Sequence, residues 1–119
     1  MRRALAPLAA VALGASTPDP LAGRVAGAPV RCIPFDRTST LTILGPRTLA
    51  WKQTERRMWV THPTGQCRPL RTGDTVIVAP FGAQLCRDDR FRSFSPGDIV
   101  PSVPCRLDGF VPHDKPEAP

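Results

Sequence analysis

The chain has 119 residues, of which 16 are basic and 10 are acidic, so its formal net charge is +6. This length fits one domain and excludes large α/β barrels and doubly wound nucleotide-binding folds. Fifteen prolines and nine glycines disfavour long helices, and an apolar content of 41% excludes disorder throughout.

The first segment has the layout of a secretory signal peptide over residues 1–16. Two arginines follow the initiator Met, an apolar run of about ten residues comes next, and three small residues end it. A run of that length is too short for a bilayer-spanning helix, which needs ~20 residues. We expect an exported protein, periplasmic or secreted, with no transmembrane segment after signal removal. Cleavage is expected near Ser16, with Gly23 and Ala28 as alternatives.

Composition divides the rest of the chain into three parts. Residues 17–29 are rich in Pro, Gly and Ala and are expected to form a flexible leader. Residues 30–112 contain the strand patterns and all four cysteines, so they are the predicted disulfide-stabilised β domain. Residues 113–119 are polar and Pro-rich and are expected to be a disordered tail.

Three strands are predicted in the first half of the domain. Residues 38–44 and 48–52 alternate between apolar and polar side chains, and a Gly-Pro-Arg turn at 45–47 separates them. Residues 58–61 form the third strand. Short connections predict that the three form an antiparallel meander.

The second half of the domain contains shorter strand signals. Residues 75–79 are a continuous apolar run, which predicts a strand buried on both faces. A weaker strand is expected at 90–94, with its two phenylalanines as candidate core residues. Strand is also expected at 99–100 and at 106–111.

No segment has a convincing helical period, and at most one helical turn is expected, at 83–85. Short strands separated by frequent turn residues favour an all-β fold. The predicted architecture is a small antiparallel β-barrel or sandwich stabilised by disulfides.

The four cysteines are Cys32, Cys67, Cys86 and Cys105. An even number in a small exported chain predicts two disulfides, and the spacing matches neither a C-x-x-C redox motif nor a zinc knuckle. First and last strands are often neighbours in a closed sheet, so we expect Cys32–Cys105 with Cys67–Cys86. Sequential pairing ranks second and crossed pairing third.

The chain resembles a family of small exported proteins of Gram-negative bacteria that is classed as a domain of unknown function, with a four-cysteine frame. The segments that carry the resemblance are Cys32-Ile33, Arg47-Thr48-Leu49, Leu85-Cys86-Arg87-Asp88, and Cys105 to Phe110 with Pro112. It covers about Cys32 to Pro112 and departs between Asp89 and Val103. The resemblance implies this fold and export, and it implies no catalytic chemistry.

Residues that could perform catalysis or bind metal are few. His62 is interpreted as an exposed loop histidine, and His113 lies near the tail. Asp88 and Asp89 are adjacent, so on a strand they would point to opposite faces, and with Asp98 they match no calcium loop. We therefore predict no catalytic residue, no cofactor and no metal site.

One hairpin combines aromatic and basic residues: Trp51, Lys52, Arg56, Arg57 and Trp59. The simpler interpretation places one Trp in the core and the other under an Arg as a cation–π pair. The functional interpretation is a ligand surface centred on Arg56 and Arg57. Its partner would be an anionic envelope polysaccharide or a lipid headgroup, with nucleic acid less favoured.

Two functional hypotheses follow from these patterns. The first is a non-catalytic structural or binding module of the cell envelope. The alternative is a small periplasmic hydrolase or redox protein that uses His62 or a free thiol.

Overall fold

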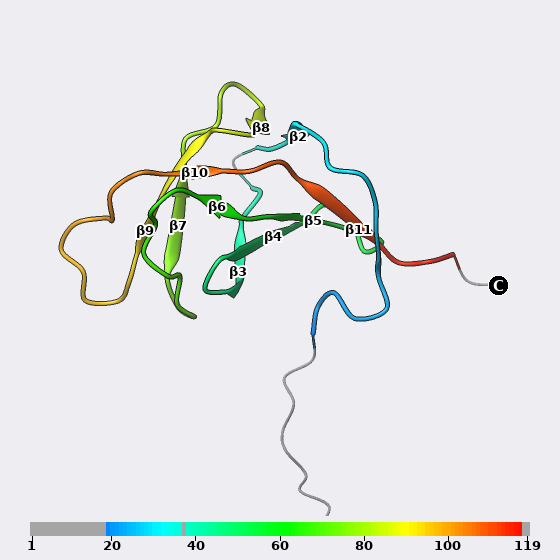
Figure 1. Ribbon diagram of the computed structural model, residues 1–119, viewed down its shortest axis with the longest axis horizontal. Coiled ribbons are helices and arrows are strands. Elements are labelled where there is room, and N and C mark those ends of the chain that lie inside the picture. Colours follow the sequence, from blue (N-terminus) through cyan, green and yellow to red (C-terminus); the bar gives the residue numbers. More distant parts are fainter. Residues whose placement is uncertain (1–18, 37, 118–119) are drawn as a thin grey trace, which may run out of the picture.

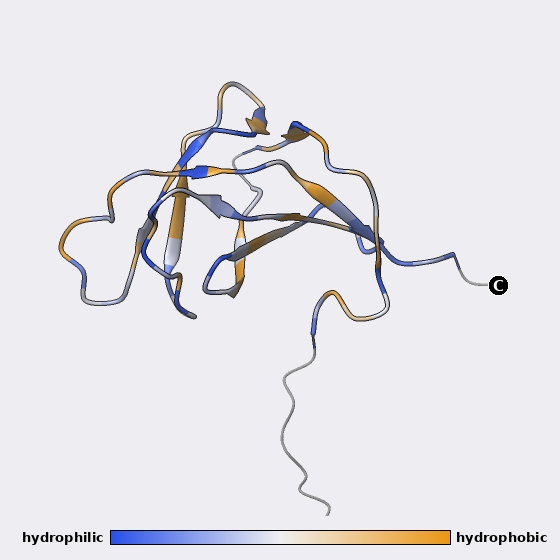
Figure 2. Cartoon of the chain, viewed as in Figure 1, coloured by the Kyte–Doolittle hydropathy of each residue, from blue (hydrophilic) through white to orange (hydrophobic). Residues whose placement is uncertain are grey.

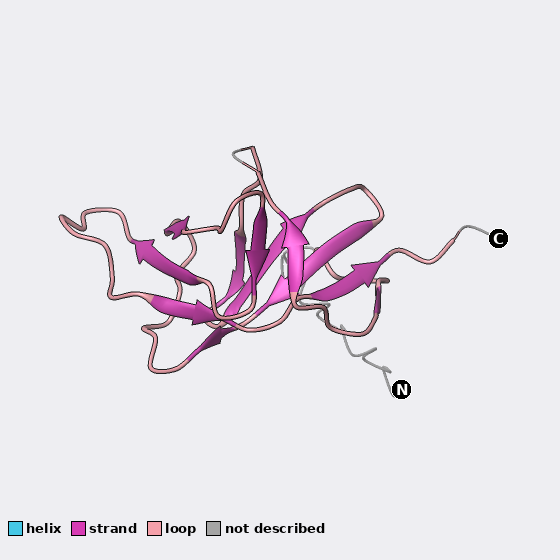
Figure 3. Ribbon diagram, turned by 90° about the horizontal axis from the view of Figure 1, so that it is seen from above, coloured by secondary structure: helices cyan, strands magenta, loops and turns pink. Residues whose placement is uncertain are grey.

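The computed structural model describes residues 19–36 and 38–117. The predicted signal peptide, residues 1–16, lies outside this range, as do the last two residues of the predicted tail. The described part consists of strands and loops without a helix (Figure 3). It accordingly offers no helix of the length and apolarity needed to cross a membrane. An all-β fold with antiparallel sheets and two disulfides confirms the predicted fold class.

The strands form three antiparallel sheets (Figure 1). The five-stranded sheet has the order β1-β11-β5-β4-β3, the four-stranded sheet β6-β10-β9-β7, and the small sheet β2-β8. The bounds are β1 Val25–Ala26, β2 Cys32–Pro34, β3 Thr42–Gly45, β4 Thr48–Lys52, β5 Arg57–Thr61, β6 Pro63–Thr64, β7 Thr75–Val78, β8 Gln84–Cys86, β9 Arg90–Phe94, β10 Cys105–Leu107 and β11 Val111–Asp114.

The predicted meander is present as β3-β4-β5, with β4 at the predicted residues. Alternation along β4 determines its two faces. Leu49 and Trp51 point into the main core, whereas Ala50 packs on the other face with Met58 and Val60.

One core joins all three sheets. Side chains from the inner faces of the five- and four-stranded sheets meet there, and Ile33 and Leu85 of the small sheet close one end. The buried members are Ile33, Phe35, Leu49, Trp51, Trp59, Leu70, Leu85, Phe91, Cys105, Leu107 and Phe110. The molecule is therefore a small sandwich of two main sheets.

The folded domain begins before residue 30, so residues 19–29 differ from the predicted flexible leader at 17–29; residues 17 and 18 lie outside the described residues. Val25–Ala26 pairs with β11, and Leu21 packs on the outer cluster of the five-stranded sheet. The Arg24 guanidinium donates hydrogen bonds to the carbonyls of Glu55, Arg56 and His113 at 2.9–3.2 Å. These contacts hold the described part of the leader against the sheet.

The domain also extends beyond the predicted end at residue 112. His113 and Asp114 pair with Met58 and Arg57, so β11 includes the first two residues of the predicted tail. The Lys115 amide continues the contact by donating to the Arg56 carbonyl at 2.8 Å.

The disulfides are crossed, Cys32–Cys86 and Cys67–Cys105, so the predicted nested pairing is wrong. Cys32 and Cys86 are register partners in the β2-β8 ladder. Cys105 begins β10, which pairs with β6, and the loop after β6 carries Cys67. Strand pairing, rather than closeness in sequence, brings each pair together.

Three strand predictions in the second half need correction. Residues 75–78 form an edge strand with one covered face, and Ile77 is 47% exposed. Residues 99–100 lie in an exposed loop instead of a strand. The stretch 106–111 divides into β10 and the start of β11, because the chain passes from the four-stranded to the five-stranded sheet at Asp108-Gly109, where the Gly109 amide donates to the Asp108 carboxylate.

Two smaller expectations also differ. The helical turn expected at 83–85 is instead strand β8, which pairs with β2. Of the two phenylalanines in β9, Phe91 is in the core at 3% exposure. Phe94 shares the opposite face with Arg92, because side chains alternate along a strand.

Candidate functional site

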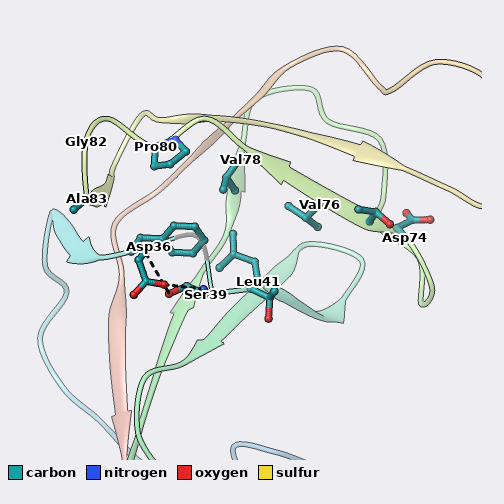
Figure 4. Close-up of a pocket in the computed structure, with 12 residues that line it drawn as sticks. Asp36, Ser39, Leu41, Asp74, Val76, Val78, Pro80, Gly82 and Ala83 are labelled. Carbon is teal, nitrogen blue, oxygen red and sulfur yellow. Dashed lines mark hydrogen bonds between the residues drawn. The ribbon is translucent and has the colours of Figure 1, made fainter.

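An apolar groove lies between β7 and the segment that leads into β3 (Figure 4). β7 and β3 are edge strands of the four-stranded and five-stranded sheets, and the two sheets do not join there. The groove has a volume of about 680 Å³. Its lining consists of Phe35, Asp36, Ser39, Thr40, Leu41, Asp74, Thr75, Val76, Val78, Pro80, Gly82 and Ala83. We call this site the edge groove.

The floor of the edge groove is aliphatic and aromatic. Leu41, Val76 and Val78 are partly buried against the main core, and their side chains point toward one another in Figure 4. Phe35 is 6% exposed and stacks edge-on against Trp51, with ring centroids 5.8 Å apart. The floor is thus a part of the core that no strand of the described chain covers.

The backbone of β7 faces the groove at alternate residues. Ser93 is the register partner of Val76. Its carbonyl accepts a hydrogen bond from the Ser102 amide, and its amide donates to the Ser102 hydroxyl. The Val76–Ser93 pair is therefore not hydrogen-bonded, so the Val76 amide and carbonyl point away from β9. By the same alternation Val78 also points away, whereas the Ala79 amide bonds to the Arg90 carbonyl. Both valines present backbone donors and acceptors to the groove.

A carboxylate stands at each end of the edge groove, Asp36 near Ala83 and Asp74 where β7 begins (Figure 4). Hydrogen bonds from Thr38 hold the pKa of Asp36 below its usual value. A hydrogen bond from the Ser95 hydroxyl does the same for the pKa of Asp74. Both groups are therefore anionic at neutral pH. The groove combines an apolar floor with an ionised carboxylate at each end.

The hairpin that carries the predicted aromatic-basic surface does not present its tryptophans as the functional interpretation requires. Trp51 and Trp59 are direct cross-strand partners, but they are 8% and 7% exposed and both belong to the core. The Trp59 indole donates to the Gln53 side chain at 2.7 Å, and the Arg57 guanidinium lies 5.2 Å from the Trp59 ring centroid. Neither indole presents a face for a ligand to stack on.

The basic residues of that hairpin are largely paired with carboxylates. Lys52 contacts Glu55 at 2.7 Å, and Arg57 makes two 2.8 Å hydrogen bonds to Asp114. The Arg57 guanidinium accordingly keeps the pKa of Asp114 below its usual value. The Arg56 guanidinium donates to the backbone carbonyl of Lys115 and has no carboxylate partner among the described residues. The hairpin therefore offers little uncompensated positive charge.

His62 is exposed, and the geometry around it does not form a nucleophilic triad. Its Nδ1 lies 2.8 Å from the Arg47 carbonyl, which fits donation from that nitrogen. The pocket beside it includes Arg31, Arg87 and Asp108, and no hydroxyl or thiol side chain of the described residues lines it. The alternative based on a free thiol also lacks its nucleophile, because all four cysteines are in disulfides.

The acidic residues considered for calcium do not converge. Asp89 accepts the Cys86 amide, and Asp98 is paired with Arg68 at 3.0 Å. Asp88 has a φ of 71° at the turn before β9, and it is exposed. Over residues 19–36 and 38–117, no group of three or more His, Cys, Asp or Glu side chains is placed to hold a metal ion.

Comparison of the chain with protein-family models, with curated proteins and with solved structures gives no significant match. The resemblance to the exported Gram-negative family therefore stays a prediction.

The edge groove was missed from the sequence. The apolar run at 75–79 was interpreted as a fully buried strand, although Thr75 interrupts the apolar pattern at its start and Pro80 follows its end. The other wall includes residues 38–41, which the alternation at 38–44 predicts as strand, whereas β3 begins only at Thr42.

Proposed function

We propose that this protein is an exported, non-catalytic binding module of a bacterial cell envelope. Its ligand is an extended peptide segment of a partner protein, bound in the edge groove as an additional strand beside β7. The observation that carries the proposal is an unpaired strand edge, with its backbone groups at Val76 and Val78, beside an uncovered part of the core.

Support for export comes from the disulfides and the first sixteen residues. Two disulfides are typical of an oxidising compartment outside the cytoplasm. The basic, apolar and small-residue layout of residues 1–16 fits a signal that directs the chain there. The periplasm of a Gram-negative cell is such a compartment.

Strand addition fits the dimensions and chemistry of the edge groove. Main-chain hydrogen bonds to Val76 and Val78 would give affinity, and alternate side chains of the peptide would cover Leu41 and Phe35. Ionised Asp36 and Asp74 at the two ends favour a peptide with basic residues at its ends. The preferred ligand is thus a short extended peptide with apolar side chains between two basic residues.

A defined peptide pair tests this proposal. The probe is acetyl-Lys-Val-Thr-Val-Thr-Lys-amide, and its partner carries N-methyl groups on the backbone amides that would face β7. Trp51 contacts Phe35 in the groove wall, so tryptophan emission reports binding. We expect the N-methylated peptide to bind at least roughly tenfold more weakly, because each lost backbone hydrogen bond costs about 1 kcal/mol.

Two protein variants serve as a matched pair. Val76→Pro removes a donor that faces the groove and leaves the β7-β9 ladder intact, so it should abolish binding. Ile77→Thr changes the opposite face of the same strand and should bind normally. A thermal melt of each variant checks folding. Equal binding of both peptides, or of both variants, would show that β7 does not receive a strand.

A further inference from the structure

The outer face of the four-stranded sheet carries three arginines. Arg90 and Arg92 alternate with core residues along β9, and Arg106 lies between buried Cys105 and Leu107 on β10. All three side chains therefore point away from the core. This arginine face is on the opposite side of the sheet from the edge groove.

The three arginines lie close together without neutralisation. Arg90 and Arg106 are direct cross-strand partners, and like charges in that position destabilise a sheet. In the described part of the chain, none of the three guanidinium groups has an ion pair or a side-chain hydrogen bond. By contrast, Arg57, Arg68 and Arg87 each contact a carboxylate. A concentrated and unpaired positive charge indicates an anionic ligand.

Apolar side chains lie among these arginines. Ile77 is the register partner of Arg92 and is 47% exposed. A shallow hollow of about 200 Å³ lies between Arg90 and Arg92, with Ile77 and Pro104 in its lining. The face is therefore cationic and apolar at once.

The loop from β9 to β10 adds a second apolar element. Ile99, Val100 and Val103 are 94%, 70% and 71% exposed. The loop projects beyond β9, on the side away from β3 and β4, in both Figure 1 and Figure 3. Figure 2 shows apolar residues at its far end. Exposed aliphatic side chains at the tip of a projecting loop are costly in water and suit an apolar phase.

We propose that the arginine face and this loop dock on a lipid bilayer with anionic headgroups. The guanidinium groups contact headgroup phosphates, while Ile99 and Val100 insert at the boundary with the acyl chains. A soluble anionic polysaccharide would use the arginines alone and would leave the aliphatic loop in water. The combination therefore favours a membrane surface, and the site is independent of the edge groove.

Vesicle sedimentation tests the docking. The purified protein, with both disulfides formed, is mixed with vesicles of phosphatidylglycerol and phosphatidylcholine, or of phosphatidylcholine alone. We expect binding only to the anionic vesicles and a steep loss with added salt. Each Arg→Gln change on the face should weaken binding about fivefold, the equivalent of about 1 kcal/mol per basic residue at an anionic surface.

Matched variants separate this site from net charge. Arg90→Gln with Arg106→Gln removes the same charge as Arg31→Gln with Arg56→Gln, two exposed arginines elsewhere. We expect the first pair to lose about 25-fold in vesicle binding. It should also keep or raise the melting temperature, because a repulsive cross-strand pair is gone. Equal losses in both double variants would overturn the assignment to this face.

The loop variant decides between a bilayer and a polyanion. Ile99→Ser with Val100→Ser should weaken binding to vesicles and leave binding to heparin, a soluble polyanion, unchanged. If the loop variant binds anionic vesicles like the parent while the arginine variant loses both ligands, the face binds polyanions and the membrane proposal is wrong.

Discussion

The contact between Arg57 and Asp114 shows how single residues join the end of the chain to the sheet. Two 2.8 Å hydrogen bonds link the guanidinium and the carboxylate across the β5-β11 pair, and the same guanidinium lies over Trp59. Both side chains are more than 40% exposed, so water screens the interaction. Its effect is modest in energy but specific in place, because it fixes β11 beyond the predicted end of the domain.

Acid should weaken this contact because it protonates the Asp114 carboxylate. Hydrogen bonding to Arg57 lowers the pKa of Asp114 in the folded state, so its stabilisation is present above the unfolded pKa of about 3.9. It is lost as the pH falls through the lower, folded value. We expect Asp114→Asn to reduce the melting temperature at neutral pH and to show a smaller further loss on acidification.

Thermal melts between about pH 7 and pH 2 measure this difference. Asp88→Asn is the matched control, because the Asp88 carboxylate is exposed and makes no ion pair in the described structure. If the melting temperature of Asp114→Asn falls on acidification as much as that of the parent, the role of the Arg57 contact is contradicted.

At the level of residues, the sequence predicted neighbours better than burial. Trp51 and Trp59 lie on consecutive strands of the predicted meander, and they are register partners. The favoured interpretation buried one Trp and placed the other under an Arg, whereas the core buries both, Trp59 with Arg57 above it. Alternation along one hairpin gives the pairing, but burial depends on a second sheet whose position no local pattern shows.

Among the elements, strands with clear alternation were the predictable ones. β4 and β9 lie at the predicted residues, since each has a buried face that imposes a period of two. β1 was missed because Val25–Ala26 is exposed on both sides, so its pairing with β11 leaves no hydrophobic pattern. For β7, the apolar run did not show that the strand lies at the edge of its sheet with one face exposed.

The contacts of the leader predict where cleavage of the proposed signal peptide would leave the new amino terminus. Leu21, Arg24 and β1 all contribute to the folded domain, so cleavage at Gly23 or Ala28 would remove them in part or entirely. We expect the exported protein to begin before Leu21. Intact mass measurement of the processed protein checks this, and a retained Met1 or a start after Leu21 would contradict it.

A truncated chain provides the energetic counterpart. For protein that begins at Pro29, the free energy of unfolding should be lower by at least about 1 kcal/mol. A backbone hydrogen bond contributes roughly 0.5–1.5 kcal/mol, and several are lost. Urea denaturation of the two forms compares them directly.

For the whole molecule, the order of the strands in the sheets explains both the disulfide pairing and the reason it was mispredicted. The argument that first and last strands are neighbours applies to β1 and β11, which do pair. The predicted first and last strands were those of Cys32 and Cys105, because the leader was not expected to contain a strand. With β1 in that place, β2 pairs with β8, and the crossed disulfides follow from the sheet order.

The four-stranded sheet separates the two proposed surfaces. Val76 and Val78 face the core and the edge groove, whereas Ile77 and Arg92 face outward. A peptide beside β7 and a bilayer against the arginine face would therefore occupy opposite sides of one sheet. Such an arrangement suits a module that holds a partner at a membrane surface.

Amide hydrogen exchange at β7 tests the central claim most directly. The peptide probe with two terminal lysines is added to the protein, and exchange is followed residue by residue. Strand addition predicts slower exchange at Val76 and Val78, whose amides face the groove, and little change at Ile77, whose amide faces β9. Unchanged exchange at both valines under saturating peptide would contradict the proposal that β7 receives a strand.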